Sequence, residues 1–342
     1  LKKLEWVSLL RLRASYGVTG GQNFNPYQAM TTYRFITDKW YGYGSGAEML
    51  ALGNDDLKWQ STVQKNFGLD LGMWKDRLTL TFNYYHKLSE NSLTDVTLPP
   101  SLGFPSYKEN LGEVVNEGWE FTLRGFVVKK EDFNIMLSVN GAQNNNKLKK
   151  ISNSLKAFNE EQDKQVENKV MARYVEGQSL NTIWVVRSLG IDPANGKELF
   201  LDKNGKRTYD WNADDYVAEA TTDPRLYGNL GLGIFYRGFS LNTYVNYSLG
   251  EKAYNQTLVD RVENADKHYN CDRRVLYDRW HKPGDETFFK DVKDASVTRP
   301  TSRFVQKNNY LNMTSLNVAY EFNPRLLEPL RIKYLKLAFY MT

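Results

Sequence analysis

Hydrophobic and polar residues alternate one by one in many short stretches of this chain. The stretch 78–85, Leu-Thr-Leu-Thr-Phe-Asn-Tyr-Tyr, is a clear example. Alternation with a period of two predicts β-strands with one apolar and one polar face. The same pattern recurs in these segments: 9–16, 62–71, 119–124, 133–140, 230–236, 241–247, 316–322 and 335–341. We therefore expect an all-β protein with about ten antiparallel strands.

The connections between the predicted strands alternate in length. Short ones lie at 72–76, 128–132, 237–238 and 323–332, and long ones at about 17–60, 88–117, 143–228 and 249–309. Outer-membrane barrels have short periplasmic turns and long external loops, whereas a soluble sandwich or propeller has no reason to lengthen every second connection. Strands of about 8 to 11 residues cross a bilayer when tilted. The pattern predicts an up-and-down transmembrane β-barrel.

Composition agrees with this prediction and removes several other classes. The chain has 342 residues, 41% hydrophobic and 14% aromatic, with a mean hydropathy of -0.59. A polar average suits a barrel, which needs apolar side chains at only every second position. No apolar run approaches the length of a transmembrane helix. The balanced net charge of +5 predicts no nucleic-acid surface, and the single Cys271 excludes a disulfide within the chain and a Cys-rich metal site.

The stretch 110–125, NLGEVVNEGWEFTLRG, shows how the pattern places individual residues. We expect a turn at 116–118 and a strand that enters the membrane at Trp119. Glu120, Thr122 and Arg124 then face water inside the barrel. One residue does not fit: Lys65 falls on the apolar face of its strand, where only snorkelling toward a nearby interface would accommodate it.

Seven motifs together resemble the SusC/RagA-like TonB-dependent outer-membrane transporters of Bacteroidetes, in the order of that family and across nearly the whole chain. They are LRLRASYGVTGGQ (10–22), LKWQSTVQKNFGLDLGMWKDRLTLTFNYYHK (57–87), LGEVVNEGWEF (111–121), LGIDPANGKELFLDKNGK (189–206), DPRLYGNLGLGIFYRGFSLNTYVNYSLG (223–250), RWHKPGD (279–285) and NNYLNMTSLNVAYEFNP (308–324).

The resemblance implies a barrel of about 22 strands in the outer membrane, an N-terminal plug, and energy from the TonB-ExbB-ExbD complex. It also implies a SusD-like surface lipoprotein as a lid and oligosaccharides, less often peptides, as ligands. No cofactor and no enzyme activity are implied. We expect residues 1–342 to form part of the barrel domain, with the plug and the closing C-terminal strands outside this sequence, since the last predicted strand has no closing partner.

Aromatic residues in the predicted external loops are the candidate ligand contacts. They are Trp40, Tyr41, Tyr43, Trp184, Trp211 and Tyr216. Aromatic faces stack on sugar rings, and neighbouring Asp and Asn side chains bond hydroxyl groups. The same residues could instead pack the loops together or contact the lid. A short helix predicted within 159–173 could likewise be a docking surface or a solvated decoration.

Other polar motifs have ordinary structural readings that we prefer. Asp192 with Asn195-Gly196, and Asp202 with Asn204-Gly205, lack the spacing of a calcium loop and predict hairpin turns. Gly231 and Gly233 predict room inside the barrel for a plug or for neighbouring backbone.

The remaining acids and histidines give no catalytic pattern. Glu113, Glu117 and Glu120 predict turn formers or inward-facing charge rather than a glycosidase pair. The three histidines, His86, His268 and His281, show no metal spacing.

The sequence therefore predicts an active importer of oligosaccharides or peptides. Two rivals stay open at this point. A passive porin-like channel would share every barrel feature but would lack the plug and the TonB contact. A secreted β-rich glycan-binding module or hydrolase would stay soluble without detergent, which a lipid-facing apolar band forbids.

Overall fold

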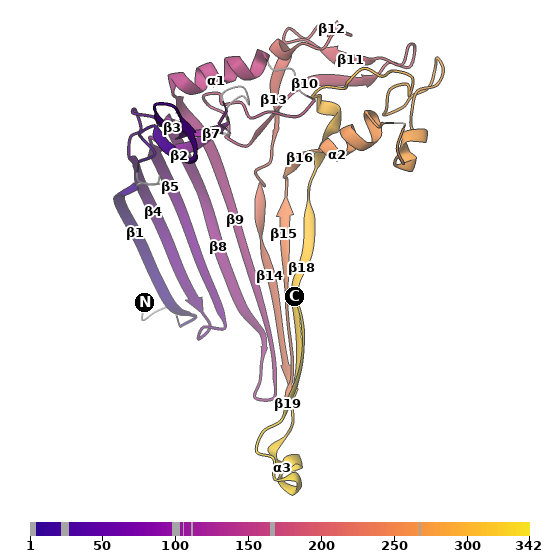
Figure 1. The fold of residues 1–342 in the computed structure, drawn as a ribbon. Helices are drawn as coiled ribbons and strands as arrows, with labels where there is room; N and C mark the ends of the chain where they lie inside the picture. Colours follow the sequence, from indigo (N-terminus) through magenta and orange to yellow (C-terminus); the bar gives the residue numbers. More distant parts are fainter. Residues whose placement is uncertain are drawn as a thin grey trace.

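The computed structural model describes residues 5–21, 27–97, 103–104, 106–110, 112–164, 168–266 and 268–342. Its main element is a nine-stranded antiparallel sheet in which spatial neighbours follow one another along the chain (Figure 1). The strands, in order, are β1 (Val7–Gly21), β4 (Gln60–Met73), β5 (Leu78–Glu90), β8 (Gly112–Lys129), β9 (Phe133–Ile151), β14 (Leu226–Tyr236), β15 (Phe239–Leu249), β18 (Tyr310–Glu321) and β19 (Lys336–Met341). The predicted all-β, up-and-down antiparallel architecture is confirmed, with nine strands where about ten were expected.

The sheet is not closed. Within the described residues, β1 pairs only with β4 and β19 only with β18. A closed barrel has no free strand edge. The nine strands therefore form one curved wall of a larger barrel, as expected.

The two faces of the wall differ in polarity, and the strand register arranges them in rows. Directly paired residues share a face, so the pairing of Leu80 with Leu71 and Leu123 continues one apolar row. The central outward rows of β4, β5, β8 and β9 are Phe67–Tyr84–Trp119–Gln143, Leu69–Phe82–Phe121–Gly141 and Leu71–Leu80–Leu123–Val139. From Leu78 to Tyr84 the apolar side of β5 rises about 20 Å, close to the height of a lipid-facing band.

A polar row marks the outer limit of this apolar band. Lys65 pairs with His86, and His86 pairs with Glu117, one row above Phe67 and Trp119. Lys65 therefore lies where the apolar face ends, which explains why a lysine is tolerated on that face.

Two strands are much longer than predicted. β8 has 18 residues and β9 has 19, so both continue well beyond the apolar band. The turn predicted at 116–118 is wrong: Asn116 and Gly118 pair with β5 on one side and with β9 on the other. Outside the membrane both faces of the strand meet water, and the alternation that reveals a strand in the sequence disappears.

Glycines on these strands accommodate large neighbours on the next strand. A Cβ on Gly118 would lie 2.7 Å from the Tyr85 hydroxyl, and a Cβ on Gly231 would lie 2.9 Å from the Tyr244 ring. The prediction that Gly231 leaves free room in the lumen is therefore wrong, because Tyr244 already covers it.

The connections also follow the predicted division into long and short. On the short-turn side, the largest connection carries α3 (Pro324–Leu327) between β18 and β19. On the opposite side, two hairpins, β2 (Thr32–Tyr41) with β3 (Gly44–Ala51) and β6 (Leu93–Thr97) with β7 (Ser106–Asn110), extend the first loops. No helix in the described ranges has the length and apolar character to span a bilayer.

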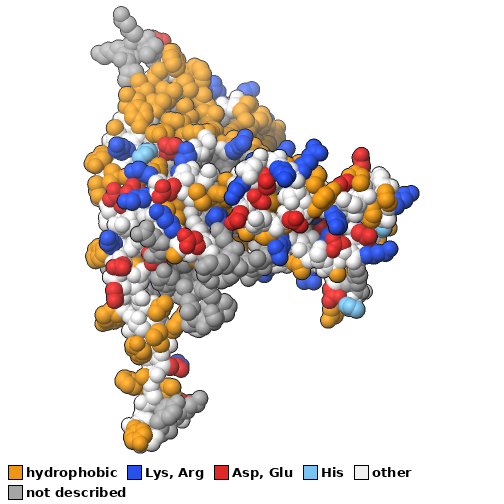
Figure 2. Space-filling view, turned by 90° about the horizontal axis from the view of Figure 1, so that it is seen from above, with side chains coloured by type: hydrophobic (Ala, Val, Ile, Leu, Met, Phe, Trp, Pro, Cys, Tyr) orange, Lys and Arg blue, Asp and Glu red, His pale blue; other side chains and the backbone are white. Residues whose placement is uncertain are grey.

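The two longest loops fold together into a structure that we call the cap, defined as the described residues of 152–225 and 250–309 (Figure 1). Its elements are α1 (Asn153–Lys164), β10 (Thr182–Ile191), β11 (Glu198–Leu201), β12 (Arg207–Thr208), β13 (Tyr216–Thr221), β16 (Lys252–Tyr254), α2 (Gln256–Leu258) and β17 (Val305–Lys307). The helix predicted within 159–173 thus begins and ends earlier. Seen from above, charged side chains of both signs are interspersed over this end of the protein (Figure 2).

Two small apolar cores hold the cap in place. One joins the tops of β8 and β9 to α1 through Val114, Leu148 and Leu155. The other lies inside the second loop around Val259, Val262 and Phe304, which are each fully buried. The predicted long loops are therefore folded structures with buried side chains of their own.

Candidate functional site

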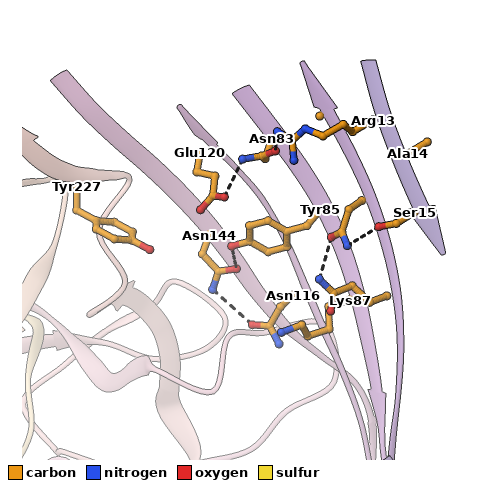
Figure 3. Close-up of a pocket in the computed structure, with 13 residues that line it drawn as sticks. Arg13, Ala14, Ser15, Asn83, Tyr85, Lys87, Asn116, Glu120, Asn144 and Tyr227 are labelled. Carbon is orange, nitrogen blue, oxygen red and sulfur yellow. Dashed lines mark hydrogen bonds between the residues drawn. The ribbon is translucent and has the colours of Figure 1, made fainter. Parts of the chain in front are cut away.

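The inward face of the barrel wall contains an open cavity of about 850 Å³ (Figure 3). Its lining comes from five strands and from the start of β14, and is almost entirely polar. Residues at its surface include Arg13, Ser15, Gln64, Asn66, Asn83, Tyr85, Lys87, Asn116, Glu120, Asn144 and Tyr227. The inward wall at this cavity is therefore rich in Asn and also carries two Tyr side chains.

Two charged groups of the cavity, Arg13 and Glu120, are hydrogen-bonded across adjacent strands. Arg13 of β1 makes two 3.0 Å hydrogen bonds to Asp70 of β4 and a third, of 2.9 Å, to Asn83 of β5. Asn83 donates in turn to Glu120 of β8 at 3.0 Å. The predicted inward position of Glu120 is confirmed. Arg13, Asp70 and Glu120 are therefore bonded within the wall, and Lys87 adds a further cation to the lining.

Amide groups dominate the upper part of the same wall. The Tyr85 hydroxyl donates to Asn144 at 2.9 Å (Figure 3). Asn146 donates to Asn116 at 2.9 Å. An amide side chain carries two donors and an acceptor, so each of these residues keeps capacity for a further bond. Such a surface suits ligands with many hydroxyl or amide groups.

A second polar hollow, which we call the rim groove, continues from the cavity to the cap. It has a volume of about 410 Å³ and lies between β9 residues 143–147 and the cap segments 177–182 and 218–225. Asp223 is held there by bonds from Ser179 (2.5 Å) and Asn181 (2.7 Å). Asn144 lines both hollows, so they adjoin at this residue, and together we call them the polar path.

The structure separates the predicted aromatic ligand contacts. Trp184 lies in β10 with only 8% of its surface exposed, and the Arg173 guanidinium stacks 5.8 Å from its ring. Tyr43, at the tip of the β2–β3 hairpin, is fully exposed (107%). Trp40 and Tyr41 are in β2, but their side chains lie outside the described residues.

Two of the predicted contacts do come together. Trp211 and Tyr216 form an edge-to-face pair with ring centroids 5.6 Å apart. The Trp211 indole nitrogen donates to the Pro300 carbonyl at 3.1 Å, and Arg299 stacks 4.9 Å from its ring. This pair therefore connects the two loops of the cap.

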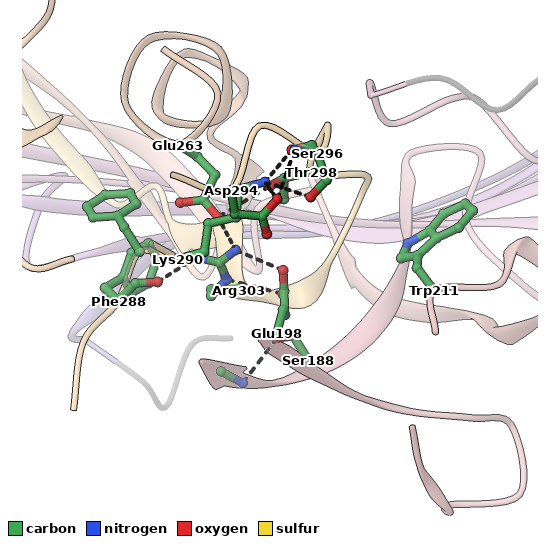
Figure 4. Close-up of polar contacts among 12 residues, drawn as sticks. Ser188, Glu198, Trp211, Glu263, Phe288, Lys290, Asp294, Ser296, Thr298 and Arg303 are labelled. Atoms are coloured by element: carbon green, nitrogen blue, oxygen red, sulfur yellow. Dashed lines mark hydrogen bonds and ion pairs between the residues drawn. The ribbon is translucent and has the colours of Figure 1, made fainter. Parts of the chain in front are cut away.

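A buried group of charges, absent from the sequence predictions, also joins the two loops (Figure 4). Arg303 of the second loop bonds Glu198 of the first at 2.8 Å and Glu263 of its own loop at 2.6 Å. The Glu263 side chain is 0% exposed. Burial lowers the pKa of Arg303, but Glu198 and Glu263 outweigh it, so the net pKa is raised and the guanidinium stays charged. Single charged residues scattered in loop sequence give no signal for such a cluster.

Other polar motifs take the structural roles preferred above. Asp192 accepts from the Ala194 amide and Asp202 from the Asn204 amide, both at 2.8 Å, so each carboxylate closes its own turn. The turns are longer than the two-residue hairpins predicted, because β10 ends at Ile191 and β11 begins at Glu198. In the described part of the chain, no group of three or more His, Cys, Asp or Glu side chains is arranged to hold a metal ion.

The three carboxylates of β8 do not converge. Glu117 and Glu120 are three residues apart in one strand and therefore face opposite sides of the sheet. Glu113 bonds Lys149 of β9 at 3.0 Å. The geometry offers no acid pair across a shared cleft.

One exposed charge pair in the cap makes the stability of its segment depend on pH. Hydrogen bonds from Arg274 lower the pKa of Asp272 from 3.8 to about 2. Because the folded pKa lies below the ordinary value, the pair stabilises the turn above about pH 4, and this contribution is lost as the pH falls toward 2. We expect hydrogen exchange in segment 269–277 of the wild type to approach that of Asp272→Asn as the pH is lowered from 5 to 2, after correction for intrinsic rates. A constant difference across this range would contradict the assignment.

Comparison with known proteins identifies the family. Residues 4–264 match the family model described as TonB dependent receptor-like, beta-barrel. The chain belongs to this family. As a TonB-dependent receptor β-barrel of the SusC/RagA-like kind, it is a protein of the outer membrane, as the sequence predicted.

Relatives of known name support the same assignment. A TonB-dependent receptor of Formosa agariphila is 24% identical over 96% of this chain and 36% of its own length. The TonB-dependent receptor SusC of Bacteroides thetaiotaomicron is 28% identical over 74% of this chain and 27% of its own. The RagAB peptide transporter matches 98% of this chain and 37% of the solved one, with a TM-score of 0.81 at 23% identity, and so shows the shared fold. The chain spans roughly a third of the length of the relatives that it matches.

Proposed function

We propose that the protein containing this chain is an active importer that carries oligosaccharides, or alternatively peptides, across the outer membrane. The observation that carries this proposal is the polar path made by the rim groove and the lumen cavity, which adjoin at Asn144. Membership of the TonB-dependent receptor family supports coupling to the TonB-ExbB-ExbD complex. Likeness to SusC and to the RagAB transporter supports a SusD-like lipoprotein as the lid.

The chemistry of the path suits weak, repeated contacts with an extended polar ligand. Each hydrogen bond to an amide of the wall contributes about 0.5 to 1.5 kcal/mol. Such bonds hold a chain of sugars or peptide units along the path and release it one contact at a time. No step of this process requires covalent chemistry.

The β2–β3 hairpin is the part of the predicted aromatic set that we propose as a ligand contact. Tyr43 is exposed at its tip, and Trp40 and Tyr41 belong to the same hairpin. For Trp211 and Tyr216, the edge-to-face pair and the bond to Pro300 favour loop packing over ligand binding, and the 8% exposure of Trp184 favours packing there too.

The test measures uptake by cells that carry the intact transporter and its lipoprotein partner. Labelled oligosaccharides and labelled oligopeptides are supplied separately, with and without TonB. We expect TonB-dependent uptake of one of the two classes. Uptake that persists without TonB would instead support a passive channel, and uptake of neither class would contradict the proposed ligands.

Asn144→Leu should weaken ligand binding by about three- to tenfold, because it removes one amide contact from the shared point of the two hollows. Binding to the purified full-length complex is measured by calorimetry. The matched control is Asn242→Leu, which changes an asparagine on the same inward face that lines neither hollow. Equal effects of the two substitutions would contradict a specific role for Asn144.

A further inference from the structure

The lipid-facing side of the wall carries an apolar groove near its short-turn end, far from the cap. It has a volume of about 500 Å³ and crosses β5, β8 and β9. Gly125 lies between Leu78 and Leu137 in the same row of paired residues, so this row lacks its middle side chain. Leu123 and Val139 close the groove above. The missing side chain leaves a channel with hydrocarbon walls.

The other end of the groove has a different chemistry. Trp74 and Arg77, from the turn between β4 and β5, line it there. Both are exposed, and the only acid within that turn, Asp76, accepts a 2.6 Å hydrogen bond from Ser8 of β1. Among the described residues, the Arg77 guanidinium has no acidic partner within ion-pair distance. Arg77 and Trp74 therefore lie at the end of the apolar groove that is nearest to the boundary between membrane and water.

The turn that carries these two side chains is fixed in position. Trp74, Lys75 and Asp76 all have left-handed backbone angles, with φ of 52°, 56° and 60°. The Asp76–Ser8 bond ties the turn to β1, and the Phe126 amide donates to the Arg77 carbonyl at 2.8 Å. The cation is therefore held beside the groove by bonds to two neighbouring strands.

We propose that this groove binds one glycerophospholipid of the periplasmic leaflet, with an acyl chain along Gly125 and the phosphate on Arg77. The groove opens on the apolar face, where hydrocarbon chains are the surrounding solvent. An anionic phosphate at interfacial depth complements the Arg77 guanidinium, and tryptophan favours the same depth. The proposal rests on membrane location and is independent of the transported ligand.

The test measures lipid retention by the full-length transporter, purified in detergent and analysed by native mass spectrometry with added phosphatidylglycerol. We expect one tightly retained phospholipid per barrel. Arg77→Gln should lower retention about fivefold, since one interfacial cation supplies about that factor. Gly125→Phe should lower it about tenfold by filling the groove, because about two buried methylene groups supply that factor. A Cβ at position 125 would lie 2.8 Å from the end of the flexible Leu78 side chain and 3.6 Å, an ordinary contact distance, from the Arg77 carbonyl oxygen.

Matched controls change the same chemistry elsewhere on the wall. Arg237→Gln removes a cation from another short turn, and Leu241→Phe adds a ring on β15, two strands beyond β9. Both variants should retain the lipid as the wild type does. Diacylglycerol, which lacks the phosphate, should bind the wild type and Arg77→Gln equally weakly. The proposal is overturned if Arg77→Gln and Arg237→Gln retain equal lipid, or if inorganic phosphate alone displaces it. If Gly125→Phe fails to fold, the comparison of Arg77→Gln with Arg237→Gln still tests the proposal, because both substitutions change exposed side chains.

Discussion

Replacing Arg303 with methionine should lower the free energy of local unfolding of the cap by about 3 to 5 kcal/mol. The substitution leaves Glu198 and Glu263 buried without their cation, and Glu263 is 0% exposed. An unpaired buried carboxylate is far more costly than the loss of a surface ion pair. The two loops that Arg303 joins should then separate locally while the barrel stays folded.

Hydrogen exchange of the cap in the full-length protein measures this effect. The expected loss corresponds to exchange faster by about two to four orders of magnitude in residues 182–201 and 299–304. Arg274→Met is the matched control, because its pair with Asp272 is exposed and screened by solvent, so its loss should barely change exchange in these segments. Similar exchange in the two variants would show that the buried cluster does not hold the loops together.

The same cluster allows a second, compensating measurement. Changing Arg303 to methionine together with Glu198→Leu and Glu263→Leu removes all three charges at once. Buried ion clusters replaced by apolar residues of similar volume often keep their stability. We expect the triple variant to recover most of the slow exchange that Arg303→Met loses.

Leu80→Arg should destabilise the barrel wall by about 2 to 4 kcal/mol, the cost of a cation near the middle of the lipid face. Leu80 pairs with Leu71 and Leu123 in a central outward row. Folding of the full-length protein into lipid vesicles is followed by its heat-dependent shift on gels during urea titration. The midpoint should move to lower urea.

The neighbouring residue provides the control. Thr81 is on the inward face, paired with Asp70 and Thr122, so Thr81→Arg places the same cation in water beside a carboxylate. We expect little or no loss of stability from this change. If both substitutions were equally harmful, the assignment of lipid to one face and water to the other would be wrong.

Much of the membrane wall could be predicted because a single physical requirement controls it. Lipid on one face forces apolar residues at every second position, and Leu78, Leu80 and Phe82 show that pattern directly. The alternation is lost only above the membrane, where both faces of β8 meet water. Asn116 and Gly118 lie in this part of the strand, and the sequence pattern wrongly predicted a turn there. The candidate cavity could be predicted in its composition, since inward positions follow from the outward ones, but not in its individual contacts.

Most contacts within the cap could not be predicted from the sequence pattern. Its charge cluster joins Glu198 to Arg303, residues separated by 105 positions in the chain, and neither has a local pattern that marks it as buried. Trp211 is similar: its aromatic character suggested a ligand contact, whereas the bond to Pro300 comes from a loop that follows two further strands.

The sequence by itself determined the fold class, the direction in which the residues of the membrane-spanning strand segments point and the family, because the bilayer imposes a period of two over the whole height of the membrane. Only the tertiary structure decided how far β8 and β9 extend, how two loops form the cap, and where Gly125 and Arg77 create a groove. These features depend on contacts between distant segments, where pairing and volume, rather than periodicity, select the residues.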